Sequence, residues 1–323
     1  MKTPLLQVKN LKKYFPVKNE FIIGKSQYLK AVDNLSFEVH KGETLGLVGE
    51  SGCGKSTTGK IIANLLSPTE GDILFEGKSI LSLNNAQLKG MRKNIQFIFQ
   101  DPYNSLNPRM SIKKIIEEPL RINKLVETSQ IDIRVSRLLD NVGLASDSKN
   151  RYPHELSGGQ RQRVGIARAL AMNPKFIVCD EAVSALDVSV QAQVLNLLND
   201  LQKEFELTYL FIAHGLNVVK HISSKVGVMY LGKLVEFGAV EEVYSNPKHP
   251  YTKALLSSIP SFNKEKKKDR IILKGEIPSP INPPTGCNFH TRCGYCMEKC
   301  KNSIPLMRIL ENNHKVACHL YEK

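Results

Sequence analysis

The segment Gly49–Thr57 (GESGCGKST) constrains the fold of this 323-residue chain more than any other segment. It matches the pattern G-x-x-x-x-G-K-[ST], follows the continuous apolar run Thr44–Val48, and precedes apolar residues at helical spacing. This context predicts a buried parallel strand, a loop whose backbone N–H groups wrap a phosphate, and a helix from Lys55. A glycine-rich turn that matches by chance is the alternative, and the flanking strand and helix argue against it. We therefore expect an α/β fold.

The residue types in this loop fit a nucleoside triphosphate with its magnesium ion. Lys55 would reach the β- and γ-phosphates, and the Ser56 hydroxyl would bind Mg²⁺. Glycines allow the backbone to wrap the phosphates closely. The predicted ATP-binding residues of the loop are Gly49, Glu50, Ser51, Gly52, Cys53, Gly54, Lys55, Ser56 and Thr57.

A pair of acids follows the apolar run Phe176–Cys179. We expect Asp180 in the shell of the Mg²⁺ ion, and Glu181 as general base or as the group that polarises the attacking water. Strands often end in acids, so this pattern alone is weak, and it gains weight from the phosphate loop.

Two further polar residues follow apolar runs. His214 comes after Tyr209–Ala213 and could stabilise charge on the γ-phosphate in the transition state. Gln100 comes after Ile95–Phe99 and could contact Mg²⁺ or the attacking water. The alternatives are a surface histidine and a turn residue.

A second glycine-rich turn, Leu156–Gln160 (LSGGQ), precedes a predicted helix. The exposed backbone N–H groups of Ser157–Gly159 would meet the positive end of that helix's dipole, which suits an anion. One chain with two anion-binding turns suggests two chains that share their nucleotides.

Composition excludes several classes of protein. The hydrophobic fraction of 41% and charged fraction of 24% are those of an ordinary globular protein. No segment approaches the ~18 consecutive apolar residues of a membrane-spanning helix, and Met1–Leu5 lacks a signal-peptide core, so we expect a cytosolic chain. The net charge of +14 suits a nucleotide, a nucleic acid or an anionic membrane surface, or is an ordinary basic surface.

Apolar runs and their spacing predict the other elements. We expect a helix near Val190–Phe205, a mostly helical insert over residues 111–155, and a linker at Ser261–Asn263 with the lysine run Lys264–Lys268. A loop or hairpin is expected at Pro16–Glu20. The remaining predicted strands are Leu5–Val8, Leu35–Val39, Ile95–Phe99, Tyr209–Ala213 and Val226–Tyr230.

Five of the seven cysteines crowd into the last 37 residues. In a cytosolic chain such a cluster favours metal binding over disulfides, and four thiolates suit zinc or an iron–sulfur cluster. Free thiols are the alternative. Cys53 and Cys179 fit small apolar positions, and Cys53 would lie beside the phosphates. The clustered residues are Cys287, Cys293, Cys296, Cys300 and Cys318.

Together these motifs resemble the ATP-binding subunits of ATP-binding-cassette (ABC) transporters. The resemblance covers residues 1–260 and implies a P-loop NTPase fold: a RecA-like core, an antiparallel β subdomain, and an α-helical subdomain at about 101–160. The motifs stand in the family's order: phosphate loop, Gln100, Leu156–Gln160, Asp180–Glu181, Ser184–Asp187 and His214.

The resemblance also implies roles that residue chemistry alone does not indicate. Two cassettes would face each other head to tail, so that Ser157, Gly158, Gly159 and Gln160 bind the partner's ATP. Asp187 would couple the two sites. Phe15 falls where the family stacks an aromatic ring on adenine, with Tyr14 as the rival. The family often has Asp after the switch histidine, whereas this chain has Gly215.

Three segments resemble the peptide importers of this family: Gln100–Arg109, Asn246–Leu256 and Gly275–His290. This resemblance implies the ATPase subunit of a dipeptide or oligopeptide permease at the cytoplasmic face of the membrane. Its partners would be a second, related ATPase, two membrane subunits and an extracytoplasmic solute-binding protein. Nickel and glutathione importers share these features.

Other ABC functions fit less well. A DNA-repair or translation ATPase would act on nucleic acid, which the charge permits, but such proteins usually carry a long coiled coil or two fused cassettes. We therefore expect no nucleic-acid partner. An exporter ATPase would lack the peptide-importer tail.

The resemblance marks residues 261–323 as a C-terminal extension. Some peptide importers carry a four-iron four-sulfur cluster here, and the family's pattern matches Cys287, Cys293, Cys300 and Cys318. Cys296 is an additional thiol that could replace one ligand. The resemblance favours the iron–sulfur cluster, and zinc is the alternative.

Overall fold

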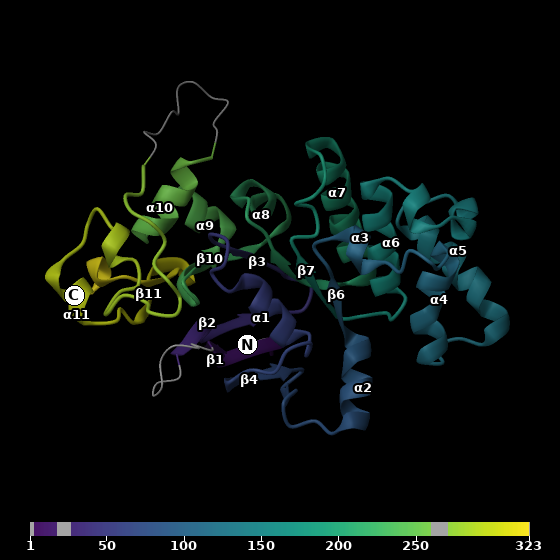
Figure 1. Cartoon of the computed structure of the whole chain (residues 1–323), viewed down its shortest axis with the longest axis horizontal. Helices are drawn as coiled ribbons and strands as arrows, with labels where there is room; N and C mark the ends of the chain where they lie inside the picture. Colours follow the sequence, from purple (N-terminus) through teal and green to yellow (C-terminus); the bar gives the residue numbers. More distant parts are fainter. Residues whose placement is uncertain (1–2, 18–26, 260–270, 323) are drawn as a thin grey trace.

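In the computed structural model, which describes residues 3–17, 27–259 and 271–322, two β-sheets face each other across helix α1 (Figure 1). The larger sheet has eight strands in the order β11-β12-β10-β9-β3-β8-β7-β6, and β9-β3-β8-β7-β6 are parallel. Its strands are β3 (Thr44–Val48), β6 (Ile95–Ile98), β7 (Phe176–Asp180), β8 (Thr208–Ile212), β9 (Lys225–Tyr230), β10 (Lys233–Ala239), β11 (Met307–Ile309) and β12 (Lys315–Ala317).

The central strands β3, β7 and β8 are buried along their whole length. Helices on both faces bury them, as their continuous apolar sequences predict. Helix α1 (Lys55–Ile62) lies between the sheets, whereas α7 (Val188–Phe205), α8 (Leu216–Ile222) and α9 (Val240–Ser245) cover the other face (Figure 1). Because these strands are parallel, their carboxyl ends meet at one edge, where the predicted site residues follow them.

The smaller sheet is antiparallel, in the order β2-β1-β4-β5. Pro16 and Val17 end strand β1 and pair antiparallel with Tyr28 and Gln27 of β2, which confirms the hairpin predicted at Pro16–Glu20. The rest of that segment, Lys18–Glu20, lies outside the described residues. The strands are β1 (Leu6–Val17), β2 (Gln27–Val39), β4 (Glu70–Phe75) and β5 (Lys78–Ser79); helix α2 (Asn85–Asn94) follows β5.

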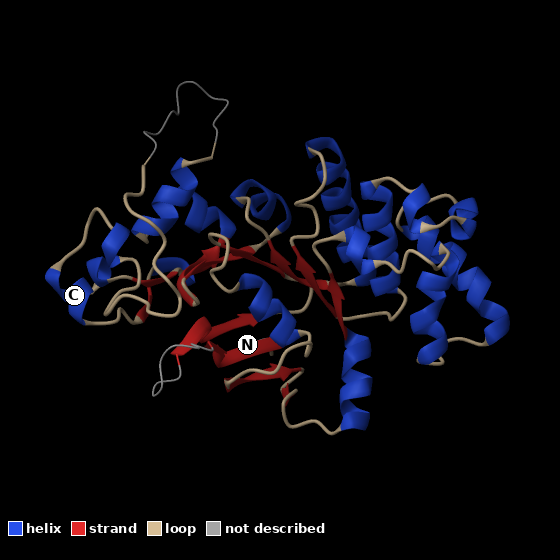
Figure 2. Ribbon diagram, viewed as in Figure 1, coloured by secondary structure: helices blue, strands red, loops and turns tan. Residues whose placement is uncertain are grey.

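The insert after β6 is helical, as predicted, and lies at the β6 end of the large sheet (Figure 2). Buried Ile, Leu and Val side chains of α4 and α5 pack with α6 in one core. Its elements are α3 (Pro102–Ser105), α4 (Ile112–Ile122), η1 (Thr128–Gln130), α5 (Ile131–Asn141), η2 (Ser146–Asn150), η3 (Pro153–Glu155) and α6 (Gly158–Leu170).

The C-terminal tail follows α10 (Pro250–Ser257) and adds two strands to the large sheet. Strand β12 pairs antiparallel with β10, so that Glu236 lies opposite Val316. The predicted linker Ser261–Asn263 and the lysine run lie outside the described residues. The other tail elements are η5 (His290–Arg292), α11 (Glu298–Asn302), η6 (Glu311–Asn313) and η7 (His319–Tyr321).

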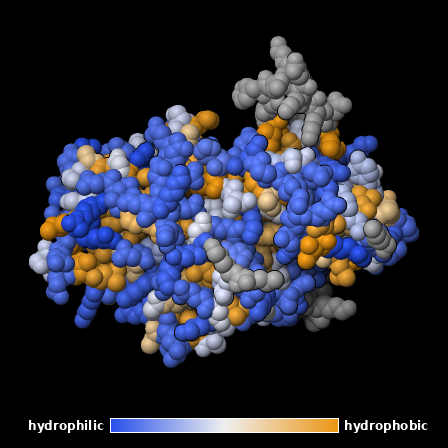
Figure 3. Space-filling view, turned by 180° about the vertical axis from the view of Figure 1, so that it is seen from behind, coloured by the Kyte–Doolittle hydropathy of each residue, from blue (hydrophilic) through white to orange (hydrophobic). Residues whose placement is uncertain are grey.

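Within the described part of the chain, every helix is too short or too polar to cross a bilayer. On the face shown in Figure 3, hydrophilic residues predominate and apolar side chains of the described residues are scattered among them.

Candidate nucleotide-binding and hydrolysis site

The phosphate loop has a backbone that only glycine accepts at two positions. Gly49 and Gly54 have φ angles of 152° and 104°. A Cβ on Gly54 would lie 2.0 Å from the carbonyl oxygen of Ala31, and one on Gly49 would lie 2.2 Å from that of Met229. Neighbouring backbone therefore fixes the loop between β3 and α1.

Lys55 is buried inside this loop. Its Nζ donates to the backbone carbonyls of Gly49 (2.8 Å) and Glu50 (3.1 Å) and lies 3.7 Å from Cys53 Sγ. Burial raises the pKa of the Cys53 thiol, against the opposing effect of the nearby Lys55 charge. The lysine is thus held at the centre of the cradle, where a phosphate would meet it.

Ser56 and Asp180 meet from α1 and β7. The Ser56 hydroxyl donates to Asp180 Oδ1 over 2.7 Å. Burial raises the pKa of Asp180, while the Ser56 hydrogen bond and the charges of Lys60 and Lys55 oppose that rise. A hydroxyl and a carboxylate side by side are the oxygen donors that Mg²⁺ prefers, so the two residues fit a magnesium site.

Glu181 is the residue on which the strand ends converge. Its carboxylate accepts a hydrogen bond from Gln100 Nε2 (2.6 Å) and lies 2.5 Å from His214 Nε2. Glu181 is buried, whereas the His214 side chain is 44% exposed. The Glu181 backbone has φ 50°, and its N–H donates to the carbonyl of Ile212 at the end of β8.

The second glycine-rich turn begins α6 and is built differently. Ser157 is the N-cap: its hydroxyl accepts from Gln160 N, and the Gln160 side chain accepts from Ser157 N. Ser157 is exposed, whereas Gly159 is buried with Val190 against it. Among the described residues, no hydrogen bond joins this turn to the phosphate loop of the same chain.

The structure separates the two candidates for adenine stacking. The Tyr14 hydroxyl donates to Asp33 over 2.6 Å, and burial with this bond raises the pKa of Tyr14. The Phe15 ring is half-buried, with Lys13 Nζ 5.0 Å from its centroid. Lys30 Nζ lies 5.8 Å from the Tyr14 centroid, so a lysine stands over each ring, and the hydroxyl bond to Asp33 is the contact that distinguishes Tyr14 from Phe15.

Asp187 and Gly215 both lie at helix starts. Asp187 caps α7 by accepting from Val190 N (2.9 Å) and Ser189 Oγ (2.7 Å). Gly215 precedes α8 with an ordinary φ of −84° and no side-chain cap. The coupling role of Asp187 stays a prediction. In this structure its side chain caps the N-terminus of α7.

Sequence reasoning missed two residues that support the phosphate loop. The Tyr251 hydroxyl accepts from the Glu50 N–H over 2.9 Å. Arg292, in the tail, forms an ion pair with the Glu50 carboxylate at 2.8 Å. Tyr251 lies in the segment Asn246–Leu256 that resembles peptide importers, but separations of 201 and 242 residues from Glu50 left no local pattern for either contact.

All seven cysteines are free thiols. Burial raises the pKa of Cys287 to about 11, with smaller contributions from Cys300, Cys318 and Cys293. These four thiols therefore lie near one another, while Cys296 is exposed at the edge of the group. Among the described residues, however, no three His, Cys, Asp or Glu side chains are arranged to hold a metal ion, so the thiols as placed do not form the predicted metal site.

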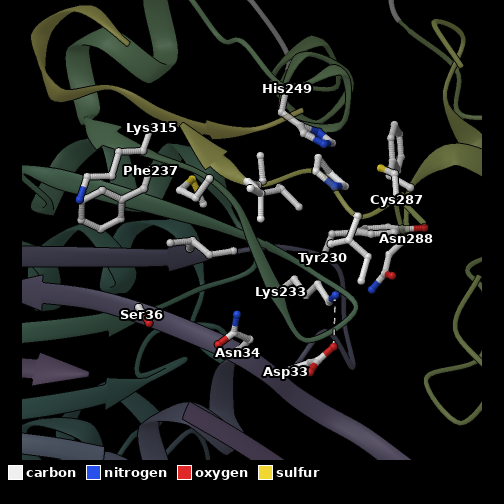
Figure 4. A pocket seen from close by; sticks show the side chains of 18 of the residues that line it. Asp33, Asn34, Ser36, Tyr230, Lys233, Phe237, His249, Cys287, Asn288 and Lys315 are labelled. Atoms are coloured by element: carbon white, nitrogen blue, oxygen red, sulfur yellow. Dashed lines mark ion pairs between the residues drawn. The ribbon is translucent and has the colours of Figure 1, made fainter. Parts of the chain in front are cut away.

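A cavity of about 390 Å³ separates part of the tail from the cassette (Figure 4). Asp33 and Lys233, an ion pair of 3.3 Å, line the cassette side, and Cys287, Asn288 and Leu306 line the tail side. The tail and the cassette therefore share the walls of this cavity.

A parallel sheet whose strand ends carry a phosphate loop, an Asp–Glu pair, a glutamine and a histidine, together with a helix-capping LSGGQ turn, defines a P-loop ATPase of the ABC class. The comparison with known families agrees. A model described as "ABC transporter" matches residues 32–184, and one described as "Oligopeptide/dipeptide transporter, C-terminal region" matches residues 235–300.

Similar proteins extend over the whole chain. The oligopeptide transport ATP-binding protein AppF of Bacillus subtilis (strain 168) is 55% identical, over 98% of this chain and 97% of that protein. The oligopeptide transport ATP-binding protein OppF of Haemophilus influenzae is 52% identical, over 97% and 96%. This chain belongs to the ATP-binding proteins of ABC transporters, within the oligopeptide and dipeptide transport group.

Solved structures agree with this assignment. The cassette MJ0796, solved as a dimer in a post-hydrolysis state bound to ADP and Pi, is 29% identical with a TM-score of 0.64. The match covers 73% of this chain and 98% of that cassette. The predicted ABC cassette fold and ATPase class are confirmed.

Proposed function

We propose that this chain is the ATPase subunit of a peptide importer, and that Glu181 activates water for ATP hydrolysis. The observation that carries the hydrolytic role is the buried Glu181 carboxylate, which Gln100 and His214 reach at 2.6 and 2.5 Å. The names of full-length relatives and the matched C-terminal region support peptides as the cargo.

The residues around Glu181 divide the work of hydrolysis. Lys55 binds the β- and γ-phosphates, and the loop N–H groups surround them. Ser56, Asp180 and Gln100 would hold Mg²⁺, which neutralises charge on the phosphate oxygens. Glu181 accepts a proton from the attacking water, and His214 hydrogen-bonds the γ-phosphate oxygens. Phe15 stacks on the adenine.

The LSGGQ turn completes the site of a second cassette. Ser157 and Gly158 lie at the solvent-accessible start of α6, where N–H groups and the helix dipole favour a phosphate. A similar cassette has been solved as a dimer. We infer that this chain pairs with a second, related ATPase beneath two membrane subunits at the cytoplasmic face, and that a solute-binding protein delivers the peptide from outside.

The cysteine-rich extension, residues 261–323, is a separate part of the proposal. We infer that Cys287, Cys293, Cys300 and Cys318 take up a metal, as an iron–sulfur cluster or zinc, through rearrangement of their side chains. Their mutual effects on pKa support one shared group of thiols. Elemental analysis of anaerobically purified protein should find iron or zinc, and finding neither would refute this part.

The Glu181→Gln variant tests the hydrolytic role. It keeps the shape of the side chain but cannot accept the proton, so we expect ATP turnover to fall by about a thousandfold while MgATP binding remains. The variant should also accumulate as a closed, ATP-bound pair with the partner ATPase, seen by size-exclusion chromatography. Turnover equal to that of the wild type would exclude Glu181 as the base.

A further inference from the structure

Arg292 places a tail side chain directly on the phosphate loop. Its Nη1 and Nη2 donate to the two carboxylate oxygens of Glu50 over 2.8 and 3.0 Å. The exposed fractions are 7% for the Arg292 side chain and 22% for that of Glu50. A bidentate pair so shielded from water is stronger and more directional than an exposed ion pair.

Three contacts hold Glu50 in the phosphate loop. Arg292 binds its carboxylate, the Tyr251 hydroxyl accepts from its N–H, and its carbonyl accepts from Lys55 Nζ. Moving Glu50 would therefore disturb the lysine that binds the phosphates. The loop's conformation and the tail's position are linked through this one residue.

The charges of the phosphate loop indicate how its contact with the tail would affect ATP binding. Within residues 49–57, the charged side chains are Glu50 and Lys55, so the cradle for an anionic triphosphate has no net charge of its own. Arg292 neutralises the Glu50 carboxylate and leaves the Lys55 charge for the phosphates. Without Arg292, an uncompensated carboxylate in the loop would repel ATP.

The tail holds Arg292 in place through a buried aromatic anchor. Phe289, 1% exposed, packs against Tyr230 and Tyr251 of the cassette, with ring centroids 5.2 and 5.4 Å apart. The turn η5 then brings Arg292 back, with its N–H bonded to the Phe289 carbonyl. Arg292 Nη1 also donates to the Tyr230 hydroxyl over 3.4 Å.

We propose that Arg292 is a positioning residue for ATP binding: by neutralising and orienting Glu50, the C-terminal tail sets the affinity of the phosphate loop for MgATP. The guanidinium has no other salt bridge among the described residues, and its buried Nε has no hydrogen-bond partner there. The inference rests on ATP as the ligand of this loop.

The experiment is a double-mutant cycle in the full-length chain, with MgATP affinity measured by isothermal titration calorimetry. We expect R292A to bind MgATP about tenfold more weakly than wild type, and R292K to fall between them because lysine keeps the charge but not the bidentate geometry. In the E50Q background, which removes the negative charge, R292A should cost less than twofold. In the assembled transporter, R292A should raise KM for ATP and leave kcat nearly unchanged.

The matched control is Y321F, which removes another contact between tail and cassette. The Tyr321 hydroxyl donates to the Lys248 carbonyl over 3.1 Å and does not touch the phosphate loop, so Y321F should bind MgATP as wild type does. Wild-type affinity in R292A, an equal loss in the E50Q background, or the same loss in Y321F would overturn the inference. If R292A fails to fold, the cycle with R292K decides. A wild-type chain that binds no MgATP would instead refute the proposed function.

Discussion

The two glycine-rich turns of this chain differ in how far the chain itself requires their glycines. In the phosphate loop, Gly49 and Gly54 have positive φ angles, and a Cβ on either would come within 2.2 Å of neighbouring backbone, so the fold of this chain requires them. In the LSGGQ turn, Gly158 has an ordinary backbone and a Cβ there would meet only Leu186 at 3.5 Å, an ordinary contact. The chain alone does not require Gly158 to be glycine. Gly159, the next residue, is again required by its own chain, since a Cβ there would lie 2.4 Å from Val190. The comparison therefore singles out Gly158 as the position where the need for glycine would come from what approaches from outside.

The largest effect should follow Gly54→Ala. A Cβ there meets the Ala31 carbonyl at 2.0 Å in a backbone that L residues avoid, so we expect the free energy of unfolding to fall by roughly 3 kcal/mol and MgATP binding to be lost. Chemical unfolding and calorimetry measure the two quantities. The control is Gly165→Ala in α6, where the added methyl has open space and should stabilise by about 1 kcal/mol. A stable, ATP-binding Gly54→Ala protein would remove the basis of the comparison.

Gly158→Ala should separate folding from turnover. We expect the isolated variant to have the same free energy of unfolding and the same affinity for MgATP as wild type, because the methyl fits. In the proposed transporter, the methyl would stand between the turn and the phosphates bound by the partner, so ATP turnover should drop by about a hundredfold. Steady-state phosphate release measures it. Full turnover would show that the turn does not approach a nucleotide.

His249 should make the free energy of unfolding sensitive to pH. Burial lowers the pKa of His249 from 6.5 to about 4. The unfolded chain therefore binds a proton near pH 6.5 while the folded chain stays neutral, so stability falls as pH drops from 6.5 toward 4, by about 2 kcal/mol at pH 5. His249→Asn keeps an acceptor for the Tyr251 N–H but does not titrate, and urea unfolding at pH 7 and pH 5 should show a smaller loss. An equal loss of stability in His249→Asn would show that other groups cause the pH dependence.

Gly215→Ser should have the smallest effect. Gly215 begins α8 with φ −84°, and a Cβ there lies 3.5 Å from Val218, so a side chain fits. A serine hydroxyl can cap the helix and should raise the free energy of unfolding by a few tenths of a kcal/mol. Thermal unfolding measures it, with Gly215→Ala as the variant that lacks the cap. A destabilised Gly215→Ser protein would show that this glycine, like Gly54, is required by the fold.

Continuous apolar runs made the parallel strands predictable. Thr44–Val48 matches β3 at both ends, and Phe176–Asp180 needed only one more residue than predicted, because full burial on both faces leaves a plain signal in the sequence. Strand β10 was not predicted, since Lys233 and Glu236 interrupt its apolar pattern. Glu236 is nonetheless fully buried, and the tail residue His314 and two backbone N–H groups satisfy its carboxylate.

The site was likewise only partly predictable from the sequence. Motif spacing predicted Ser56, Gln100, Asp180, Glu181 and His214, and the parallel strand ends bring them together. Their contacts across the site and the tail's contact with Glu50 depend on how distant segments pack, and nothing near Arg292 in the sequence marks it. Cysteine spacing predicted the thiol group but left open which four form it.

The pairing of β12 with β10 bears on how this protein can be divided. A chain cut near residue 260 would leave β10 as a bare sheet edge with unpaired N–H and C=O groups, a template for aggregation. It would also leave Glu236 without His314 and Glu50 without Arg292. Such a truncated chain would be a damaged protein rather than a minimal cassette, and any activity it lost could not be credited to the tail alone.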